Sequence, residues 1–375
     1  MNRSRRAVLG GALAAAAAPA LARVPANEDP LVQVDSLDVA FRLVRNQPLT
    51  TAESMGLTLP FLLDFNYDHY RAHPSVIAQW RARADGGLAR QRHTHEVLVG
   101  GRLRVPSRAI WPSPGMFEET GYAGTVGLPF YKAFSVNWDD EVFSVGNQPA
   151  LPAGFEELNA IRRNGAVYQV VAAEVDGRAA RLVLVPGYSM GVGLYEPYFR
   201  RQALWDAYPR RRDVQAYDGG GVTHRVVVAR RFKLGPLEMD EPIVRLERRP
   251  GIEGADGYIG MDMLRRLNVR VDRSVGMKVW AGLSRQAGEP QLDDRGGVTL
   301  VKRAEGWMAD QVDPAGPAYK AGVRDGDMIV EHEGDGGLEG LAFALTRAAG
   351  TVVPIKISRD GGAFQPIRIE LEERV

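Results

Sequence analysis

The stretch Asp256–Asp272, which reads DGYIGMDMLRRLNVRVD, decides the fold because an earlier segment of the chain repeats its pattern. Residues 124–139 read GTVGLPFYKAFSVNWD. In each segment two glycines bracket a hydrophobic pair, a short helical turn follows with apolar residues four apart, and an alternating strand closes the pattern. The repeat predicts a duplicated unit in the order strand, glycine-pinched turn, helix, strand. The positions that match in kind are Gly124 with Gly257, Gly127 with Gly260, Phe130 with Met263, Phe134 with Leu267, Val136 with Val269, Trp138 with Val271 and Asp139 with Asp272.

The N-terminus carries the features of an export signal. Three arginines (residues 3, 5 and 6) precede an alanine-rich apolar run, and Ala20-Leu21-Ala22 follows it as a small-residue cleavage site. The Ser4-Arg5-Arg6 start resembles a twin-arginine signal. We therefore predict a signal peptide over residues 1–22 and a periplasmic protein. The alternative, a retained membrane anchor, is disfavoured because the apolar run is shorter than the roughly 20 residues that a span needs, so we expect no transmembrane span in the mature chain.

Composition sets further bounds. The 375 residues, 45% of them hydrophobic, give room for two or three globular domains. The chain has no cysteine, which excludes disulfides, thiol catalysis and Cys-ligated metals, so its domains depend on core burial alone. Without residues 1–22 it has 44 basic and 46 acidic residues, a balance that gives no indication of nucleic-acid binding. We expect no cofactor.

The part of the chain before the first repeat predicts a β-rich lobe over residues 31–148. An alternating segment, 31–44, begins it, and a strand from Gly56 delivers an acid at Asp64. A hairpin follows around residues 95–104, turning at two consecutive glycines. The turn formers after residue 146 then indicate a linker.

A second lobe over residues 151–283 repeats this plan. Strands over 167–174 and 179–185 are joined at Asp176-Gly177, a strong hairpin signal. The turn that begins at Val185 stands where the turn after Asp64 stands in the first lobe. The remaining expected elements are a helix over 196–207, a glycine-rich turn over 218–221 and a strand over 223–232.

Two tandem lobes, each with a hydrophobic strand that runs into a tight turn, resemble the pepsin and retropepsin class of aspartic proteases. The stretch Asp256–Asp272 is similar to the closing segment of bacterial retropepsin-like proteins that carry a PDZ domain, and the resemblance covers residues 31–283. It implies a mainly β fold in which Asp64 and position 185 hold the catalytic acids at the floor of a cleft. Such a pair shares one proton, so that one acid acts as a base on water while the other acts as an acid toward the substrate carbonyl.

The sequence departs from that family at both turns. Phe65 and Asn66 follow Asp64 where the family has Thr and Gly, while Val185 and Pro186 stand where lobe two would have Asp and Thr. Catalytic groups that act as a unit lose most of their effect when one is removed. We therefore expect a degenerate site with Asp64 as its remnant. The alternative is an active aspartic endopeptidase that uses Asp64 with an acid from another subunit.

Several other polar residues are interpreted as solvated surface. Two histidine pairs could share a face, His69 with His73 and His93 with His95. Pro74 biases His73 away from a helix, so we expect no metal site. Ser189 has no histidine at a fixed spacing that would suggest serine chemistry. The same solvated interpretation applies to the arginine clusters at residues 200–201 and 210–212.

The C-terminal portion, residues 292–375, resembles a PDZ domain. Residues 316–334, GPAYKAGVRDGDMIVEHEG, match that family's helix, glycine turn and following strand. By this resemblance a helix over 338–348 lines the peptide groove, with Phe343 and Leu345 as candidate pocket or core residues. The loop that receives a peptide's terminal carboxylate through backbone N–H groups is formed by Gly296, Gly297, Val298 and Thr299.

These features together indicate an exported pseudoprotease of two aspartic-protease-like lobes and a PDZ domain, whose partners are peptides or protein C-termini. A purely structural role in an envelope complex is a further alternative. Two geometric expectations follow. Asp64 and Val185 should face each other across the two lobes, and Gly297 should need a backbone conformation or a close approach that a side chain would obstruct.

Overall fold

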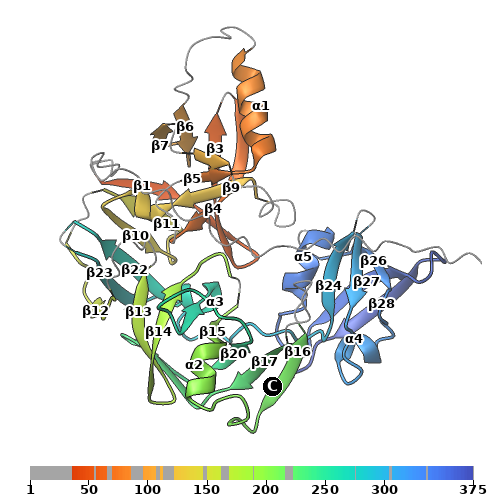
Figure 1. The fold of residues 1–375 in the computed structure, drawn as a ribbon. Coiled ribbons are helices and arrows are strands. Elements are labelled where there is room, and N and C mark those ends of the chain that lie inside the picture. Colours follow the sequence, from red (N-terminus) through yellow and green to blue (C-terminus); the bar gives the residue numbers. More distant parts are fainter. Residues whose placement is uncertain are drawn as a thin grey trace, which may run out of the picture.

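A computed structural model describes residues 36–374 apart from short gaps, and the structural statements below concern the described residues (Figure 1). Strand accounts for 48% and helix for 11% of the structure, so the fold is mainly β as the sequence predicts, with several sheets that include a curled half-barrel. The signal-peptide segment lies outside the described part. The gaps are residues 55, 66–69, 86–95, 107–109, 113–121, 147–149, 162–168, 189, 216–222, 275, 304–305 and 335–336.

An eight-stranded sheet forms the first unit. Its order is β7-β6-β3-β4-β9-β5-β8, and β2 pairs with β3. Helix α1 (Pro74–Asp85) follows β5 and was not predicted from the sequence. The strands are β2 (Arg42–Val44), β3 (Gln47–Ser54), β4 (Leu57–Asp64), β5 (Tyr70–Ala72), β6 (Glu96–Val99), β7 (Leu103–Pro106), β8 (Ile110–Pro112) and β9 (Gly124–Gly127).

A nine-stranded sheet forms the second unit, in the order β16-β17-β20-β15-β21-β14-β13-β18-β19. Helix α2 (Glu196–Arg201) follows β15, and α3 (Met261–Leu264) follows β21. The strands are β13 (Val170–Val175), β14 (Arg178–Leu184), β15 (Val192–Tyr195), β16 (Arg211–Gln215), β17 (Thr223–Val228), β18 (Arg231–Leu234), β19 (Leu237–Asp240), β20 (Ile243–Glu247) and β21 (Gly257–Ile259).

The duplication predicted from the sequence is confirmed in the strand pairing. In the first unit β9 lies between β4 and β5, parallel to the former and antiparallel to the latter. In the second unit β21 lies between β14 and β15 with the same two orientations. A short helix follows each inserted strand: η2 (Leu128–Phe130) after β9 and α3 after β21. The two glycine-pinched segments therefore occupy equivalent places.

Close backbone approach explains why glycine stands at the start of both inserted strands. A Cβ atom on Gly124 would lie 2.3 Å from the carbonyl oxygen of Arg71, and one on Gly257 would lie 2.0 Å from that of Gly193. Both oxygens belong to the antiparallel neighbour of the inserted strand. The same backbone contact thus demands glycine twice.

The two units share a six-stranded sheet, in the order β1-β11-β10-β22-β23-β12. At its centre β10 pairs antiparallel with β22, and Val136 lies opposite Val269, its own counterpart in the repeat (Figure 1). The indole N–H of Trp138 donates to the carbonyl of Leu267 at 2.7 Å. The strands are β1 (Leu37–Ala40), β10 (Ala133–Asn137), β11 (Val142–Val145), β12 (Glu156–Leu158), β22 (Leu267–Asp272) and β23 (Lys278–Leu283).

The C-terminal sheet has five strands in the order β24-β25-β26-β27-β28 and lies to one side of the other three sheets (Figure 1). Its hydrophobic cluster, from Val298 to Leu371, is separate from the large cluster that the two units share. Its elements are β24 (Thr299–Arg303), β25 (Gly306–Asp310), α4 (Pro317–Lys320), β26 (Met328–His332), α5 (Gly337–Ala344), β27 (Val352–Ser358) and β28 (Gln365–Glu370).

Three elements differ from the sequence prediction, each for a local reason. Helix α2 ends at Arg201 because Ala203 adopts a left-handed backbone with φ +52°. The strand expected over 223–232 divides into β17 and β18, since the N–H groups of Arg230 and Arg231 turn toward the Asp176 carboxylate. Helix α5 ends at Ala344, four residues early, where the hydroxyl of Thr346 donates to the carbonyl of Phe343.

The close approach at Gly257 gives a stability prediction. We expect Gly257→Ala to destabilise the protein by about 2 to 3 kcal/mol, because the new methyl group must push β21 away from β15. Gly288→Ala is the matched control, since no atom lies within 4 Å of its Cβ position and its φ is not positive. Urea denaturation of both variants measures the difference, and equal effects would contradict the argument.

The carboxylate of Asp256 gives a pH prediction. It accepts hydrogen bonds from the Arg181 side chain at 3.0 and 3.2 Å and from Arg201 at 3.1 Å. Burial opposes its ionisation, but these bonds prevail and hold the pKa of Asp256 below its ordinary value of 3.8. The stabilisation is therefore present above that value and is lost as the pH falls through the lowered pKa.

We expect Asp256→Asn to lower the free energy of unfolding by about 2 kcal/mol at neutral pH. The gap between the variant and the original protein should narrow as the pH falls below 3.8 and through the lowered pKa of Asp256, because the carboxylate becomes protonated there. Urea denaturation at several pH values measures it. A gap that does not change with pH would exclude a stabilising role for the ionised carboxylate.

Candidate functional site

Strand β4 ends at Asp64, the first of the predicted site residues. Asp64 is buried, and its register partner on β9 is Gly127. Phe65 follows and is fully buried, with its ring 5.6 Å from that of Phe134 and 6.4 Å from that of Trp138. The residue that replaces the family's Thr is therefore a core residue and cannot provide a hydroxyl to a second turn. Asn66 lies outside the described residues.

The equivalent turn of the second unit begins at Val185. Its N–H donates to the carbonyl of Ile259 at 2.8 Å, and the N–H of Tyr188 donates back to the Val185 carbonyl at 3.1 Å. The Tyr188 carbonyl in turn accepts from the N–H of Met261 at 2.6 Å. Pro186 is buried inside this turn. The turn is thus closed and fixed to the end of β21, with an isopropyl group where the resemblance would place a carboxylate.

Aromatic and cationic side chains surround this second turn. The ring of Tyr188 packs edge-on against that of Tyr258, with centroids 4.7 Å apart. The guanidinium of Arg249 lies 5.5 Å from the Tyr188 ring centre and 5.8 Å from that of Tyr258. Arg249 also pairs with Glu247 at 2.6 Å. These contacts form a cation–π cluster in which the charge of Arg249 is already paired with Glu247.

The turn of the second unit lies beside strand β4 of the first unit. A Cβ atom on Gly187 would lie 3.5 Å from Cδ2 of Leu62, which precedes Asp64 by two residues on β4. The turn of the second unit therefore lies against the strand that carries Asp64. That Asp64 and Val185 face each other across this contact stays a prediction.

The loop predicted to receive a peptide carboxylate has the expected backbone. Gly297 has φ +72°, and a Cβ atom there would lie 3.0 Å from Cζ of Arg374 and 3.1 Å from Cα of Gly316. The expectation that a side chain is obstructed at Gly297 is confirmed. At Gly296 a Cβ atom would lie 2.6 Å from Cδ2 of Leu345. Leu345 was a candidate for either the peptide pocket or the core, and it is buried in the core of the C-terminal sheet.

A carboxylate from the chain itself occupies this loop. Oδ1 of Asp294 accepts hydrogen bonds from the N–H groups of Gly297 at 2.9 Å and Gly296 at 3.2 Å. Its Oδ2 accepts from Arg374 at 2.9 Å and from Arg212 at 3.3 Å. The loop therefore binds a carboxylate through two backbone donors, and two guanidinium groups lie on the carboxylate's other side.

A cavity of about 380 Å³ opens beside the loop, between it and β16, the edge strand of the nine-stranded sheet. Oε1 of Gln311 and Nε of Arg212 are buried without a hydrogen-bond partner. Both residues line the cavity, so an entering polar chain would meet an acceptor and a donor there. The lining residues are Arg212, Asp213, Val214, Asp294, Gly297, Val298, Thr299, Gln311, Val312, Asp313, Pro314 and Arg374.

The sequence interpretation of Arg212 as solvated was wrong. Its side chain is only 10% exposed and pairs with Asp293 at 2.8 Å as well as with Asp294. Asp293 is almost fully buried, and burial raises its pKa while the guanidinium of Arg212 opposes that shift. Sequence reasoning also missed Asp294 and Arg374. The position of Asp294 two residues before a glycine pair is a turn signal that could have identified it.

The histidines do not form a candidate metal centre in the described part of the chain, where no group of three or more His, Cys, Asp or Glu residues could hold an ion. His73 precedes α1, as the following proline predicts, and its Nδ1 lies 2.6 Å from the hydroxyl oxygen of Ser75. His69, His93, His95 and Ser189 lie outside the described residues. Among the helices that are described, none has the length and apolarity needed to cross a membrane.

No protein-family model matches the chain, and a comparison with the curated proteins finds no match.

Proposed function

We propose that this chain is an exported peptide- or protein-binding pseudoprotease, with two aspartic-protease-like lobes and a C-terminal PDZ-like unit, which acts in the periplasm. The observation that carries the proposal is the loop at Gly296 and Gly297, whose N–H groups hold a carboxylate with Arg374 on its other side. A loop that binds the carboxylate of Asp294 has the donors to bind the terminal carboxylate of a peptide.

The position of the loop supports this function. It leads directly into β24, which lies at one edge of the five-stranded sheet. In the described residues no other strand pairs with the outer side of β24. An extended peptide can therefore add to this edge through main-chain hydrogen bonds while its terminus reaches Gly297.

The duplicated units support the aspartic-protease-like part of the proposal. Both have a strand inserted between two others and a short helix after it. Position 185 is a valine, however, and Phe65 belongs to the core. A cleft of this kind can bind an extended chain but lacks the paired acids that would activate water. Binding without cleavage is the function that fits both observations.

Asp294 sets the conditions for peptide binding. Because its carboxylate occupies the two N–H groups, an incoming terminus must displace it, and the cost of displacement lowers the apparent affinity. The displaced carboxylate remains close to Arg212 and Arg374, so the side chain keeps partners in the bound state. The loop therefore alternates between an internal and an external carboxylate.

We expect Asp294→Ala to raise peptide affinity by on the order of tenfold, because both N–H donors become available. The probes are fluorescein-labelled heptapeptides of random sequence with a free C-terminal carboxylate, and the same pool with amidated ends. Fluorescence anisotropy should show binding of the free-carboxylate pool alone. Asp294→Asn is the matched control: it keeps an acceptor oxygen and should gain less.

Gly297→Glu should abolish this binding, since Gly297 has a left-handed backbone and no room for a side chain. Thermal denaturation should show that the two units still unfold cooperatively in this variant. Equal binding of free and amidated pools, or full affinity in Gly297→Glu, would place peptide binding elsewhere.

The alternative of an active aspartic endopeptidase is favoured by one observation, the acid retained at the end of β4. If the cleft is inactive, the mature protein should not cleave unfolded casein between about pH 3 and pH 7, and Asp64→Asn should change nothing. Val185→Asp alone should also fail, because Phe65 and Pro186 do not provide the family's turn residues. Cleavage that disappears in Asp64→Asn would overturn the pseudoprotease proposal.

A further inference from the structure

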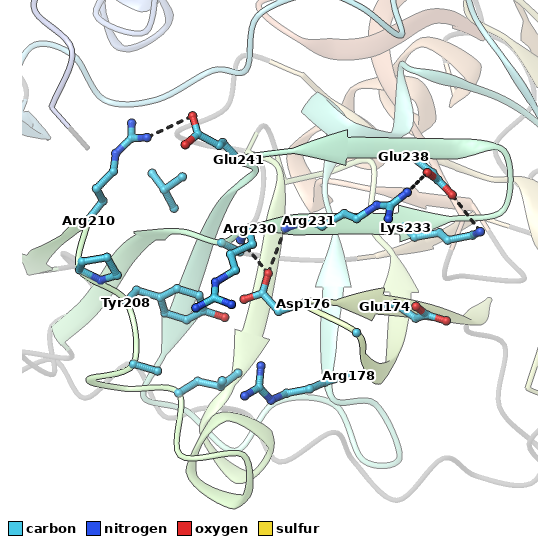
Figure 2. A pocket seen from close by; sticks show the side chains of 16 residues that line it. Glu174, Asp176, Arg178, Tyr208, Arg210, Arg230, Arg231, Lys233, Glu238 and Glu241 are labelled. Atoms are coloured by element: carbon cyan, nitrogen blue, oxygen red, sulfur yellow. Dashed lines mark hydrogen bonds and ion pairs between the residues drawn. The ribbon is translucent and has the colours of Figure 1, made fainter.

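A second cavity, of about 740 Å³, lies in the nine-stranded sheet, apart from the loop at Gly297 (Figure 2). It is formed by the tip of the β13–β14 hairpin, the segment after α2, and strands β17 to β19. Its volume falls in the range of small-molecule sites. The lining residues are Glu174, Asp176, Gly177, Arg178, Leu204, Ala207, Tyr208, Pro209, Arg210, Val228, Ala229, Arg230, Arg231, Lys233, Glu238 and Glu241.

The apolar part of this cavity comes from side chains packed into the core. Leu204, Tyr208 and Ala229 are buried and belong to the hydrophobic cluster that the two units share. Their positions are therefore set by core packing, not by the cavity. A ligand would find a fixed apolar surface there.

Three of the five cationic side chains around the cavity form ion pairs. Glu238 pairs with Arg231 and, at 2.9 Å, with Lys233. Glu241 pairs with Arg210 at 3.2 Å. Figure 2 shows these pairs along one side of the cavity. Glu238 and Glu241 are thus occupied. Glu174 and Asp176 also line the cavity, so five cationic side chains face four acidic ones and the lining carries a small excess of positive charge.

The carboxylate of Asp176 is also occupied, but by backbone groups. Its Oδ1 accepts from the N–H of Arg230 at 2.7 Å and from that of Arg231 at 3.0 Å. This arrangement fixes the hairpin tip, where Asp176 has φ +54°. Within the described part of the chain, the guanidinium groups of Arg178 and Arg230 form no hydrogen bond and no ion pair within 4.0 Å, although Arg178 lies close enough to Tyr208 to interact with it electrostatically.

A buried phenol completes the arrangement. Tyr208 is only 5% exposed. Among the described residues its buried hydroxyl has no hydrogen-bond partner within 3.5 Å, and the Asp176 carboxylate is an acceptor close enough to act on it. Figure 2 shows Tyr208, Arg178 and Arg230 around the same central space. Burial, with the nearby carboxylate of Asp176, raises the pKa of Tyr208, so the hydroxyl is protonated and can donate at neutral pH.

We propose that this cavity binds a small organic anion, a carboxylate or phosphate group on a short apolar body, held by Arg178, Arg230 and the hydroxyl of Tyr208. A guanidinium group presents two parallel donors that match either anion. The apolar body would rest on Ala207 and Pro209, the exposed apolar side chains of the lining. The site is independent of the loop at Gly297 and of the proposed peptide binding.

The test is isothermal titration calorimetry of the mature protein with phenyl phosphate and benzoate, and with benzyl alcohol as the neutral probe. We expect saturable binding of at least one anion and none of the alcohol. The stronger of the two anions identifies the group that the site prefers. Binding should weaken in about 0.5 M salt because the contacts are electrostatic.

Arg178→Gln and Arg230→Gln should each weaken anion binding by on the order of tenfold, and Tyr208→Phe by several-fold. Arg178 and Arg230 are exposed, so these variants should retain the stability of the original protein in thermal denaturation. The matched control is Arg368→Gln, which removes one exposed cation from β28, outside the cavity. Anion binding that is absent, equal to that of the alcohol, or lowered as much by Arg368→Gln would overturn the proposal.

Discussion

The antiparallel pairing of β10 with β22 is the interaction on which the two units depend. It sets Val136 opposite Val269 and Phe134 opposite Val271, and all four residues are buried. The closing strands of the two repeated segments are therefore direct neighbours in one sheet. Burying a side chain of this size contributes roughly 1.5 to 3 kcal/mol. Because the strands that follow the two pinched turns are the ones that pair, this contact also brings the turn at Val185 toward β4.

Local patterns predicted the parts of this fold that local chemistry decides. The hairpins at residues 100–101 and 176–177 were identified because their turns require positive φ, which the structure shows at all four positions. The repeated glycines mark a real duplication, since β9 and β21 occupy equivalent places between their neighbours. The predicted helix over 196–207 was too long, because the left-handed backbone at Ala203 is not marked by a glycine or proline.

Contacts between distant parts of the chain could not be predicted in this way. Arg212 is bonded to Asp293, 81 positions away, and Arg374 to Asp294, 80 positions away. Each arginine looks like ordinary surface charge in its own segment. The carboxylate loop illustrates the same limit: its glycines and Asp294 lie in one segment with local signals, but the two arginines behind that acid come from distant segments.

The two kinds of constraint at the pinched turns can be separated on physical grounds. Positions 124 and 257 require glycine because a neighbouring carbonyl oxygen lies 2.3 or 2.0 Å from where a Cβ atom would stand, which is too close for any side chain. This requirement is independent of any activity of the site. A second acid at position 185 would be demanded only by chemistry, since the turn there closes through backbone groups alone. The chain meets the first requirement at both glycines and has valine at position 185, so its backbone architecture does not depend on a second acid.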